Sequence, residues 1–186
     1  GLGGGSSNAA CTMKAVNTLL SLGATDEQLM EIGKSLGCDI PFFVKCEPAR
    51  CQGIGEKTTP IKIKNNYYVL IVKPEAGCST RKVYAVADTM DLTSCDVDTV
   101  IKALEEGDDE LLANSISNAL QAPAISLVPA IQAIIDELKA DGLKIVQMSG
   151  SGSAVFALST DKKLLKKVFK KLANKYQVEL AKVLKK

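Results

Sequence analysis

The sequence predicts an α+β fold, in which a first segment over 1–66 precedes a ferredoxin-like split β-α-β domain over 67–186. Three observations predict it. Short β-rich runs separated by Pro, Gly or Asn occupy part of the first half, and amphipathic helical runs follow Gly77. From residue 67 the order of elements is strand, helices, strand, strand, helix, strand. With 46% hydrophobic residues in 186, the chain can bury a sizeable core.

In the first half, a glycine loop leads into an amphipathic run with Val16, Leu19, Leu20 and Gly23 at helical spacing. Thr25 and Gln28 then form a capping-box pattern before a second helix, which we expect Gly37 to end. That helix places one set of residues on a single face: Leu29, Ile32, Gly33 and Leu36. Strands are predicted at 41–46, 50–54, 60–64 and 67–73.

In the second half, helices are predicted at 80–90, 97–106, 109–119 and 127–141. The last has the clearest apolar stripe, formed by Leu127, Val128, Ile131, Ile134, Ile135 and Leu138. Strands at 143–148 and 154–158, a helix at 161–174 and a strand near 176–183 complete the domain. The lysines of the 161–174 helix are interpreted as the solvated face of a core helix rather than as a membrane-surface helix, because its apolar stripe is needed to cover the sheet.

Composition limits the partners and the chemistry. The 23 basic and 21 acidic residues give a net charge of +2, so we expect neither a nucleic-acid nor a membrane partner. No run approaches the ~20 apolar residues that span a bilayer. The chain has no His, and its six cysteines form no CxxC pair, which disfavours a zinc site and removes Ser-His and Cys-His catalysis. Reduced cysteines in a cytoplasmic protein are expected.

The strongest candidate for a binding site is the run GLGGGSSNAA at residues 1–10. Glycines let backbone N–H groups approach phosphate oxygens, the following helix directs its positive end at them, and serine hydroxyls reach phosphate or Mg²⁺. The run lacks the GK[ST] ending of a Walker A loop. An expression linker is the alternative. Leu2 and the direct passage of Asn8 into a helix argue against it.

A second motif, LGCDIPFF at 36–43, contains Asp39 between a helix end and an apolar run. A carboxylate there, partly buried at the wall of a cleft, can orient a substrate hydroxyl and accept its proton. Taken alone, Asp39 is more often a turn residue. The remaining motifs are QGIGEK at 52–57, GCSTRKVY at 77–84 and MSGSGS at 148–153, and each also fits an ordinary turn, helix start or glycine-rich connection.

Together and in this order, the motifs resemble those of the galactokinase, homoserine kinase, mevalonate kinase and phosphomevalonate kinase (GHMP) family. The resemblance implies that 1–66 is the C-terminal remnant of the family's N-terminal ATP-binding, S5-like domain, and that 67–186 is its C-terminal domain. It implies ATP and Mg²⁺ as cofactors and Asp39 as the catalytic residue. The implied nucleotide-binding residues are Gly1, Leu2, Gly3, Gly4, Gly5, Ser6, Ser7 and Asn8, with Ser7 also on Mg²⁺, and the implied substrate-binding residues are Tyr84, Ser149, Gly150, Ser151 and Gly152.

The form of the motifs is similar to the branch of the family that phosphorylates the 2-hydroxyl of 4-diphosphocytidyl-2-C-methyl-D-erythritol in non-mevalonate isoprenoid biosynthesis. The partner is then a small-molecule substrate, and the sequence says nothing of oligomeric state. Family members carry an assisting lysine and a first conserved motif before the glycine loop, so we expect this chain to be a fragment that is inactive alone. Two alternatives stay open: a GHMP kinase acting on homoserine, mevalonate or phosphomevalonate, and a non-catalytic ferredoxin-like binding module.

Overall fold

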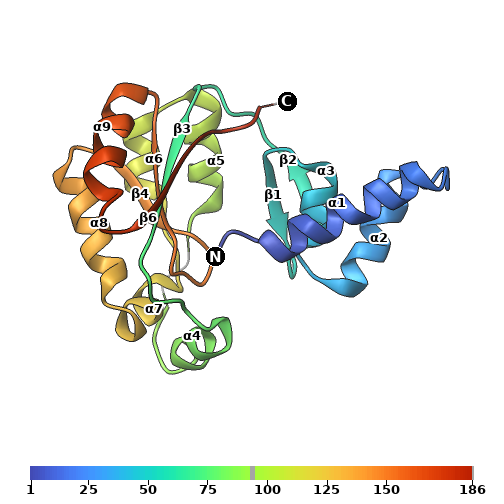
Figure 1. Ribbon diagram of the computed structural model, residues 1–186, viewed down its shortest axis with the longest axis horizontal. Coiled ribbons are helices and arrows are strands. Elements are labelled where there is room, and N and C mark those ends of the chain that lie inside the picture. The colour runs from blue at the N-terminus through green and yellow to red at the C-terminus, as the bar shows by residue number, and fades with distance from the viewer. Residues whose placement is uncertain (93–94, 186) are drawn as a thin grey trace. The chain divides into compact units, whose positions relative to one another are not determined.

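The computed structural model describes residues 1–92 and 95–185, which form two compact units (Figure 1). Among the described residues, the N-terminal unit comprises 3–62 and 184–185. The four-stranded unit comprises Gly1–Leu2 and Ile63–Val183. The interpretation of 1–66 as the remnant of an ATP-binding domain stays a prediction.

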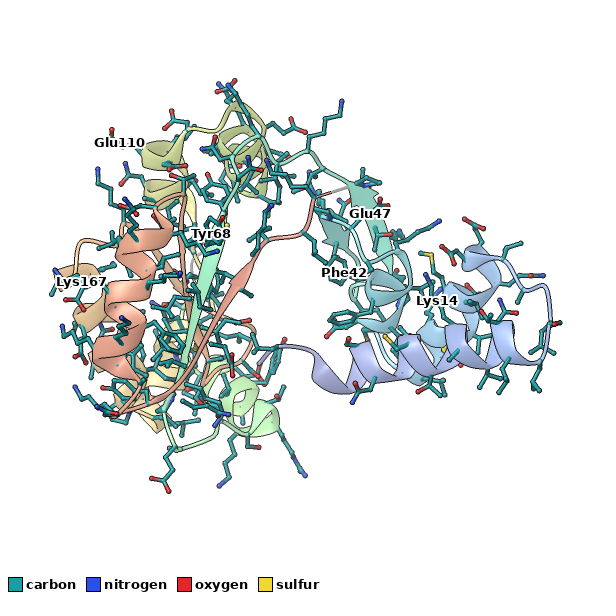
Figure 2. The ribbon with its side chains drawn as sticks, turned by 45° about the horizontal axis from the view of Figure 1, so that its top comes forward. Lys14, Phe42, Glu47, Tyr68, Glu110 and Lys167 are labelled. Carbon is teal, nitrogen blue, oxygen red and sulfur yellow. The ribbon has the colours of Figure 1, made fainter. Side chains whose placement is uncertain are left out.

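The N-terminal unit packs three helices and a hairpin. Its elements are α1 (Gly4–Leu19), α2 (Asp26–Leu36), α3 (Ile40–Lys45), β1 (Ala49–Gln52) and β2 (Lys57–Pro60). The two strands pair antiparallel, and the small core contains Ala10, Leu29, Ile40 and Val44. Lys14 of α1, labelled in Figure 2, lies 3.6 Å from Asp26 of α2.

The predicted capping box of α2 is confirmed. The Gln28 N–H donates to Thr25 Oγ1 at 3.3 Å, and the Thr25 N–H donates to Gln28 Oε1 at 2.9 Å. The predicted apolar face is only half right, because Leu29 and Gly33 are buried whereas Ile32 and Leu36 are exposed. A Cβ on Gly33 would lie 2.5 Å from Ile40, so α3 packs directly on the backbone of α2 at that glycine.

The strand predicted at 41–46 is wrong, since these residues lie in helix α3. Its Phe and Val content suits a strand, but Pro41 lies in the first turn of the helix, where the backbone N–H has no partner inside the helix and its absence costs little. Ile40, Pro41 and Val44 then fall on one buried side. The strands predicted at 50–54 and 60–64 are shifted: the hairpin lies at 49–52 and 57–60, and residues 61–64 belong to neither sheet.

The four-stranded unit has the predicted ferredoxin-like order. Its strands are β3 (Tyr68–Lys73), β4 (Ile145–Met148), β5 (Val155–Ser159) and β6 (Gln177–Lys182), arranged β4-β5-β3-β6 with every neighbouring pair antiparallel. Helix α9 (Lys162–Leu172) connects β5 to β6. The split β-α-β prediction from residue 67 is confirmed.

The helices between β3 and β4 differ from expectation in the middle of the crossover. They are α4 (Thr80–Ala87), α5 (Val97–Glu106), α6 (Asp109–Ser115), α7 (Gln121–Leu127) and α8 (Ala130–Ala140). The helix predicted at 109–119 stops at Ser115, α7 was not predicted, and the helix predicted at 127–141 begins only at Ala130. Pro129 caps α8 and interrupts the apolar stripe, so Leu127 is exposed while the stripe from Val128 to Leu138 is buried.

Alternation along the strands places helices on both faces of the sheet. Leu70, Val72, Val146, Met148 and Val155 share one face and pack against α7, α8 and α9, and Figure 1 shows α8 and α9 together on that side. The other face presents Ile145 and Leu158 to α5 and α6.

Helix α9 follows the sequence prediction. Leu165, Val168 and Leu172 are buried on the sheet, whereas Lys167 points outward (Figure 2). Within the described residues, no helix has the length and apolar character needed to cross a bilayer.

A buried polar cluster fixes the start of β3. The Tyr67 hydroxyl and the Asn65 amide both donate to Asp109 Oδ1. Burial first, and the Asp109 hydrogen bond second, raise the pKa of Tyr67 to about 12. The same Asn65 amide donates to the Gly107 carbonyl at 3.0 Å, so this cluster joins β3 to the α5–α6 turn.

Candidate nucleotide and substrate site

The glycine run makes a shorter loop than the sequence suggested. Gly3 adopts the left-handed conformation at φ 63°, and helix α1 already begins at Gly4. The Ser7 N–H donates to the Gly3 carbonyl at 2.9 Å, which leaves the N–H groups of Gly4, Gly5 and Ser6 without partners inside the helix. Gly3 supplies no side-chain cap for them. These three N–H groups at the positive end of α1 form a site suited to an anion.

The space beside Gly4 and Gly5 is open. A Cβ built on Gly4 or Gly5 would meet no atom within 4 Å, whereas one on Gly3 would lie 2.8 Å from the Phe43 ring. Phe43 therefore covers one side of the loop and leaves the first helical turn open. No group of three His, Cys, Asp or Glu side chains gathers as a metal site in the described part of the chain. Mg²⁺ at a nucleotide usually takes one or two protein carboxylates together with phosphate oxygens and waters. The assignment of the Ser7 hydroxyl as a ligand stays a prediction.

Asp39 lies directly before α3 as its N-cap residue. The sequence suggested a partly buried carboxylate, but Asp39 is exposed and its side chain makes no capping hydrogen bond. The Phe43 N–H donates to the Asp39 carbonyl at 3.3 Å, so Asp39 lies one helical turn before the ring that covers Gly3. Helix α3 thus links the residue that carries the carboxylate to the start of α1 through Phe43.

The QGIGEK motif forms the predicted turn between two strands and lies beside Asp39. Glu56 accepts a hydrogen bond from the Ile54 N–H at 2.8 Å, and backbone N–H groups lower the pKa of its carboxyl. A Cβ on Gly55 would lie 3.2 Å from the Cys38 carbonyl and 3.5 Å from Asp39 Oδ1. On β1, partial burial and the charge of Asp39 raise the pKa of the Cys51 thiol. The turn therefore packs its backbone closely against the segment that carries Asp39.

The SGSGS segment connects β4 to β5 and touches the first residue of the chain. Ser149 Oγ donates to the Gly1 carbonyl at 2.6 Å. A Cβ on Gly1 would lie only 2.7 Å from the Gly152 carbonyl oxygen, so the close approach depends on glycine. The structure thus brings together two motifs that lie at opposite ends of the sequence, within the four-stranded unit.

Tyr84 lies on α4 and is 53% exposed, which excludes a core position. Thr80, four residues earlier and therefore on the same helical face, has its Oγ1 2.8 Å from Ser151 Oγ. The exposed ring of Tyr84 consequently shares a helical face with a residue that contacts the 149–152 loop.

Three residues at these places were not singled out from the sequence: Phe43, Thr80 and Asn118. Asn118 donates from its amide to the Met148 and Gly150 carbonyls at 2.9 and 2.8 Å. Nothing in the sequence links Asn118 to a loop about 30 residues later. Thr80 lies inside the GCST motif, which is the one signal that could have found it.

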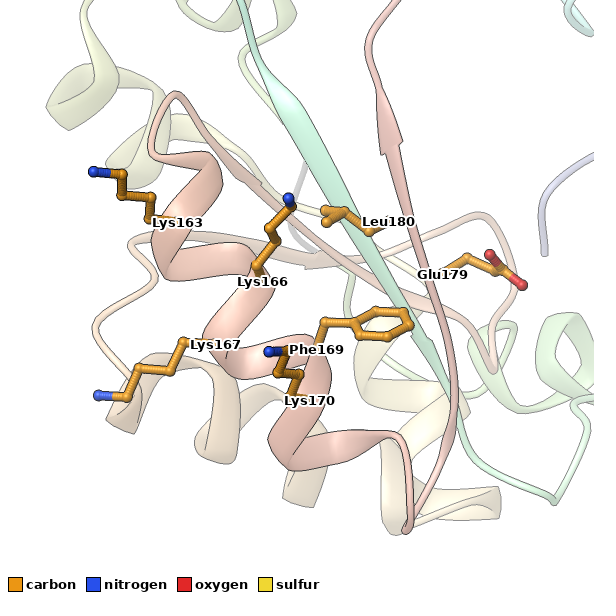
Figure 3. A pocket seen from close by; sticks show the side chains of 7 residues that line it. All are labelled: Lys163, Lys166, Lys167, Phe169, Lys170, Glu179 and Leu180. Atoms are coloured by element: carbon orange, nitrogen blue, oxygen red, sulfur yellow. The ribbon is translucent and has the colours of Figure 1, made fainter.

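A separate groove lies between α9 and β6 (Figure 3). Its volume is about 720 Å³, and Phe169 and Leu180 line it together with lysines of α9. It contains none of the predicted site residues, so the motifs do not converge there.

Two family profiles match the chain. The profile for the GHMP kinases N terminal domain matches residues 1–47, and the profile for GHMP kinases C terminal matches residues 100–178.

Curated relatives have one name in common. The chain is 35% identical over 163 residues to 4-diphosphocytidyl-2-C-methyl-D-erythritol kinase of Caldicellulosiruptor bescii, which covers 87% of this chain and 57% of the relative. It is 41% identical over 161 residues to the same kinase of a Geobacter species and 35% identical over 178 residues to that of Clostridium beijerinckii. The chain therefore spans between 56% and 64% of the length of these relatives.

Solved structures agree with the fold. A crystal structure of 4-(cytidine 5'-diphospho)-2C-methyl-D-erythritol kinase matches with a TM-score of 0.80 at 27% identity, over 97% of this chain and 65% of that chain. Mevalonate kinase of L. major matches with a TM-score of 0.77 at 18% identity, over 97% of this chain and 65% of that chain. At that identity, the second match supports the fold alone.

Proposed function

This chain belongs to the GHMP kinase family, and we propose that it supplies the phosphate loop and the catalytic aspartate of an ATP-dependent small-molecule kinase. The proposed acceptor is 4-diphosphocytidyl-2-C-methyl-D-erythritol, phosphorylated on its 2-hydroxyl. The names of the curated relatives at 35% to 41% identity support this acceptor. Because the chain spans less than two thirds of their length, activity is proposed for the protein that carries this chain.

One observation carries the proposal: the open N-terminus of α1 and Asp39 belong to the same compact unit and are linked through Phe43. The helix supplies three N–H donors without competing side chains at Gly4 and Gly5. Asp39 lies about 6 Å along α3 from Phe43, at a rise of ~1.5 Å per residue. Phosphoryl transfer needs positioning and charge stabilisation more than covalent chemistry, and these are the groups that α1 and Asp39 provide.

In the proposed reaction, the acceptor hydroxyl oxygen forms a bond to the γ-phosphorus of ATP. The bond from that phosphorus to the β,γ-bridging oxygen breaks, and ADP leaves. Asp39 orients the hydroxyl and accepts its proton. The N–H groups of Gly4 and Gly5 bind phosphate oxygens and hold the chain in line with the acceptor. Mg²⁺, when bound, neutralises charge on the phosphates, and Ser7 is its proposed protein ligand.

The four-stranded unit supplies the proposed acceptor contacts. Tyr84 has an exposed ring suited to stack on the cytosine. In the 149–152 loop, the Ser149 and Gly152 N–H groups bind carbonyls and the Ser149 hydroxyl donates to Gly1, so the Gly150 and Ser151 N–H groups are the donors proposed for the diphosphate. The contacts of Ser149 with Gly1 and of Ser151 with Thr80 support a shared role for these segments.

An acceptor panel tests the proposal. The complete gene product is incubated with ATP, Mg²⁺ and, separately, the diphosphocytidyl acceptor, homoserine, mevalonate or phosphomevalonate, and ADP release is followed in a coupled assay. We expect release with the first acceptor only. Turnover of another acceptor would assign the protein to a different branch of the family. Failure to bind ATP by calorimetry would instead favour a non-catalytic module.

A further inference from the structure

The amide nitrogen of Asn118 binds the end of β4 and the loop between β4 and β5. Asn118 lies between α6 and α7, half-buried. Its amide nitrogen donates to the Met148 carbonyl at 2.9 Å and to the Gly150 carbonyl at 2.8 Å. Its amide oxygen accepts from the Leu120 N–H at 2.9 Å. Both amide protons of Asn118 are therefore spent on alternate carbonyls of one short loop.

A second amide supports the same loop. Gln121, at the start of α7, accepts from the Met148 N–H through Oε1 at 3.2 Å. Asn118 thus binds the carbonyl of Met148, and Gln121 binds its N–H. Both side chains come from the segment that connects α6 to α7 and begins α7, outside β4 and β5. The remaining bonds within the loop are Ser149 N–H to the Ala154 carbonyl and Gly152 N–H to the Ser149 carbonyl, both 2.9 Å.

The contact with Gly150 sets the direction of the next N–H. The peptide bond between Gly150 and Ser151 is trans, and in a planar trans peptide the N–H points opposite to the C=O. Because the Gly150 carbonyl points at Asn118, the Ser151 N–H points away from it. A hydrogen bond to a carbonyl also polarises its peptide group, which makes the N–H a stronger donor.

We propose that Asn118 is a positioning residue that holds the Ser151 N–H directed away from the Asn118 amide, so that this N–H donates to a phosphate oxygen of the bound ligand. The ligand class is a diphosphate ester or the phosphate chain of a nucleotide, so the inference rests on the proposed function. Asn118 touches no substrate in this role. It fixes the loop conformation that Gly150, at φ 55°, allows.

The test follows backbone amides of the ¹⁵N-labelled chain by NMR. Inorganic pyrophosphate is titrated into the wild type, Asn118→Ala, Asn118→Ser and a matched control, Asn174→Ala, in an exposed position after α9. In the wild type and the control we expect a saturable shift of the Ser151 amide. In Asn118→Ala the shift disappears, while exchange of the Ser149 and Gly152 amides rises roughly ten- to thirty-fold, the effect of losing two neutral hydrogen bonds. Asn118→Ser keeps one hydroxyl donor, so we expect it to retain part of the Ser151 shift and part of the protection of the Ser149 and Gly152 amides.

Several outcomes would overturn the assignment. One is a wild-type Ser151 amide that ignores pyrophosphate, and another is an Asn118→Ala loop that exchanges and responds as the wild type does. If Asn118→Ala does not fold, the Ser151 shift and the amide exchange rates of Asn118→Ser and the wild type test the proposal instead. A parallel MgATP titration read at Gly4 and Gly5 reports on the proposed function. If MgATP does not shift the Gly4 and Gly5 amides while pyrophosphate still shifts the Ser151 amide, the proposed function is wrong and the proposed role of Asn118 is retained.

Discussion

The Ser149 hydroxyl donates a 2.6 Å hydrogen bond to the Gly1 carbonyl, across 148 positions of sequence. The contact joins the SGSGS segment to the first residue of the glycine run. It also explains why glycine occupies position 1, since a Cβ there would lie 2.7 Å from the Gly152 carbonyl oxygen.

At the start of α1, substitutions of neighbouring glycines have opposite effects on stability. Gly3→Ala forces a positive φ and a contact of 2.8 Å with Phe43, so we expect a loss of about 1–3 kcal/mol in the free energy of unfolding. Gly4→Ala adds a methyl group in open space on a helix and should stabilise by about 0.5–1 kcal/mol. Urea unfolding measures both. Gly4→Ala should nevertheless weaken ATP binding by calorimetry, because the methyl group takes the space proposed for phosphate, and unchanged affinity would contradict the placement of ATP.

Gly152→Ala should be far more harmful than Gly142→Ala. Both glycines have a positive φ, 85° and 89°, but a Cβ at 152 would lie 2.9 Å from Met148 Sδ, whereas one at 142 meets nothing within 4 Å. We expect a loss of about 1–2 kcal/mol from backbone strain at position 142, and a further ~1–3 kcal/mol from overpacking at position 152. Equal losses in chemical denaturation would show that the loop moves away from the core without cost.

Asp39→Asn should lower kcat of the active gene product by about 10²–10⁴-fold and leave ATP affinity nearly unchanged, because a positioned base acts mainly in the transition state. Steady-state kinetics and calorimetry measure the two quantities. Asp136→Asn, at an exposed position on α8, is the matched control and should have no effect. A near-normal kcat for Asp39→Asn would remove Asp39 from the chemistry.

Tyr84→Ala should raise KM for the diphosphocytidyl acceptor, since a base stacked on an aromatic ring contributes about 1–3 kcal/mol. The ring is 53% exposed, so thermal stability should change little. Tyr84→Phe retains the ring and should behave as the wild type. An unchanged KM for Tyr84→Ala would leave the cytosine without its proposed platform.

Alkaline pH should destabilise the fold through Tyr67. Its folded pKa is raised to about 12 by burial and Asp109, while an unfolded tyrosine titrates near ~10. The unfolded chain therefore loses the proton first, and the contribution of the protonated hydroxyl is complete below pH ~10 and is lost as pH rises toward 12. Lysines titrate in the same window, so the measurement is the difference between unfolding curves of the wild type and Tyr67→Phe. A difference that does not depend on pH from 9 to 12 would rule out this linkage.

Sequence patterns predicted those elements whose signals are local. The capping box at Thr25 formed as expected because its two hydrogen bonds join residues three apart. The sheet from residue 67 followed from the order of the elements, since a split β-α-β order closes in few ways. The helix at Ile40–Lys45 overlaps the strand predicted at 41–46, because a short run rich in Phe and Val cannot reveal that Ile40 packs on Gly33.

By itself, the sequence determined the class of fold, the five motifs and, through their resemblance, the kinase family. The sequence also singled out Asp39, Tyr84 and the two glycine-rich segments, 1–8 and 149–152, as candidate site residues. Only the tertiary structure decided that Gly1 touches Ser149, that Phe43 covers Gly3 and that Asn118 holds the 149–152 loop. These contacts join residues far apart in the chain. Packing and the need to pair backbone carbonyls decide which residues make these contacts. Neither requirement produces a periodic pattern of residues in the sequence.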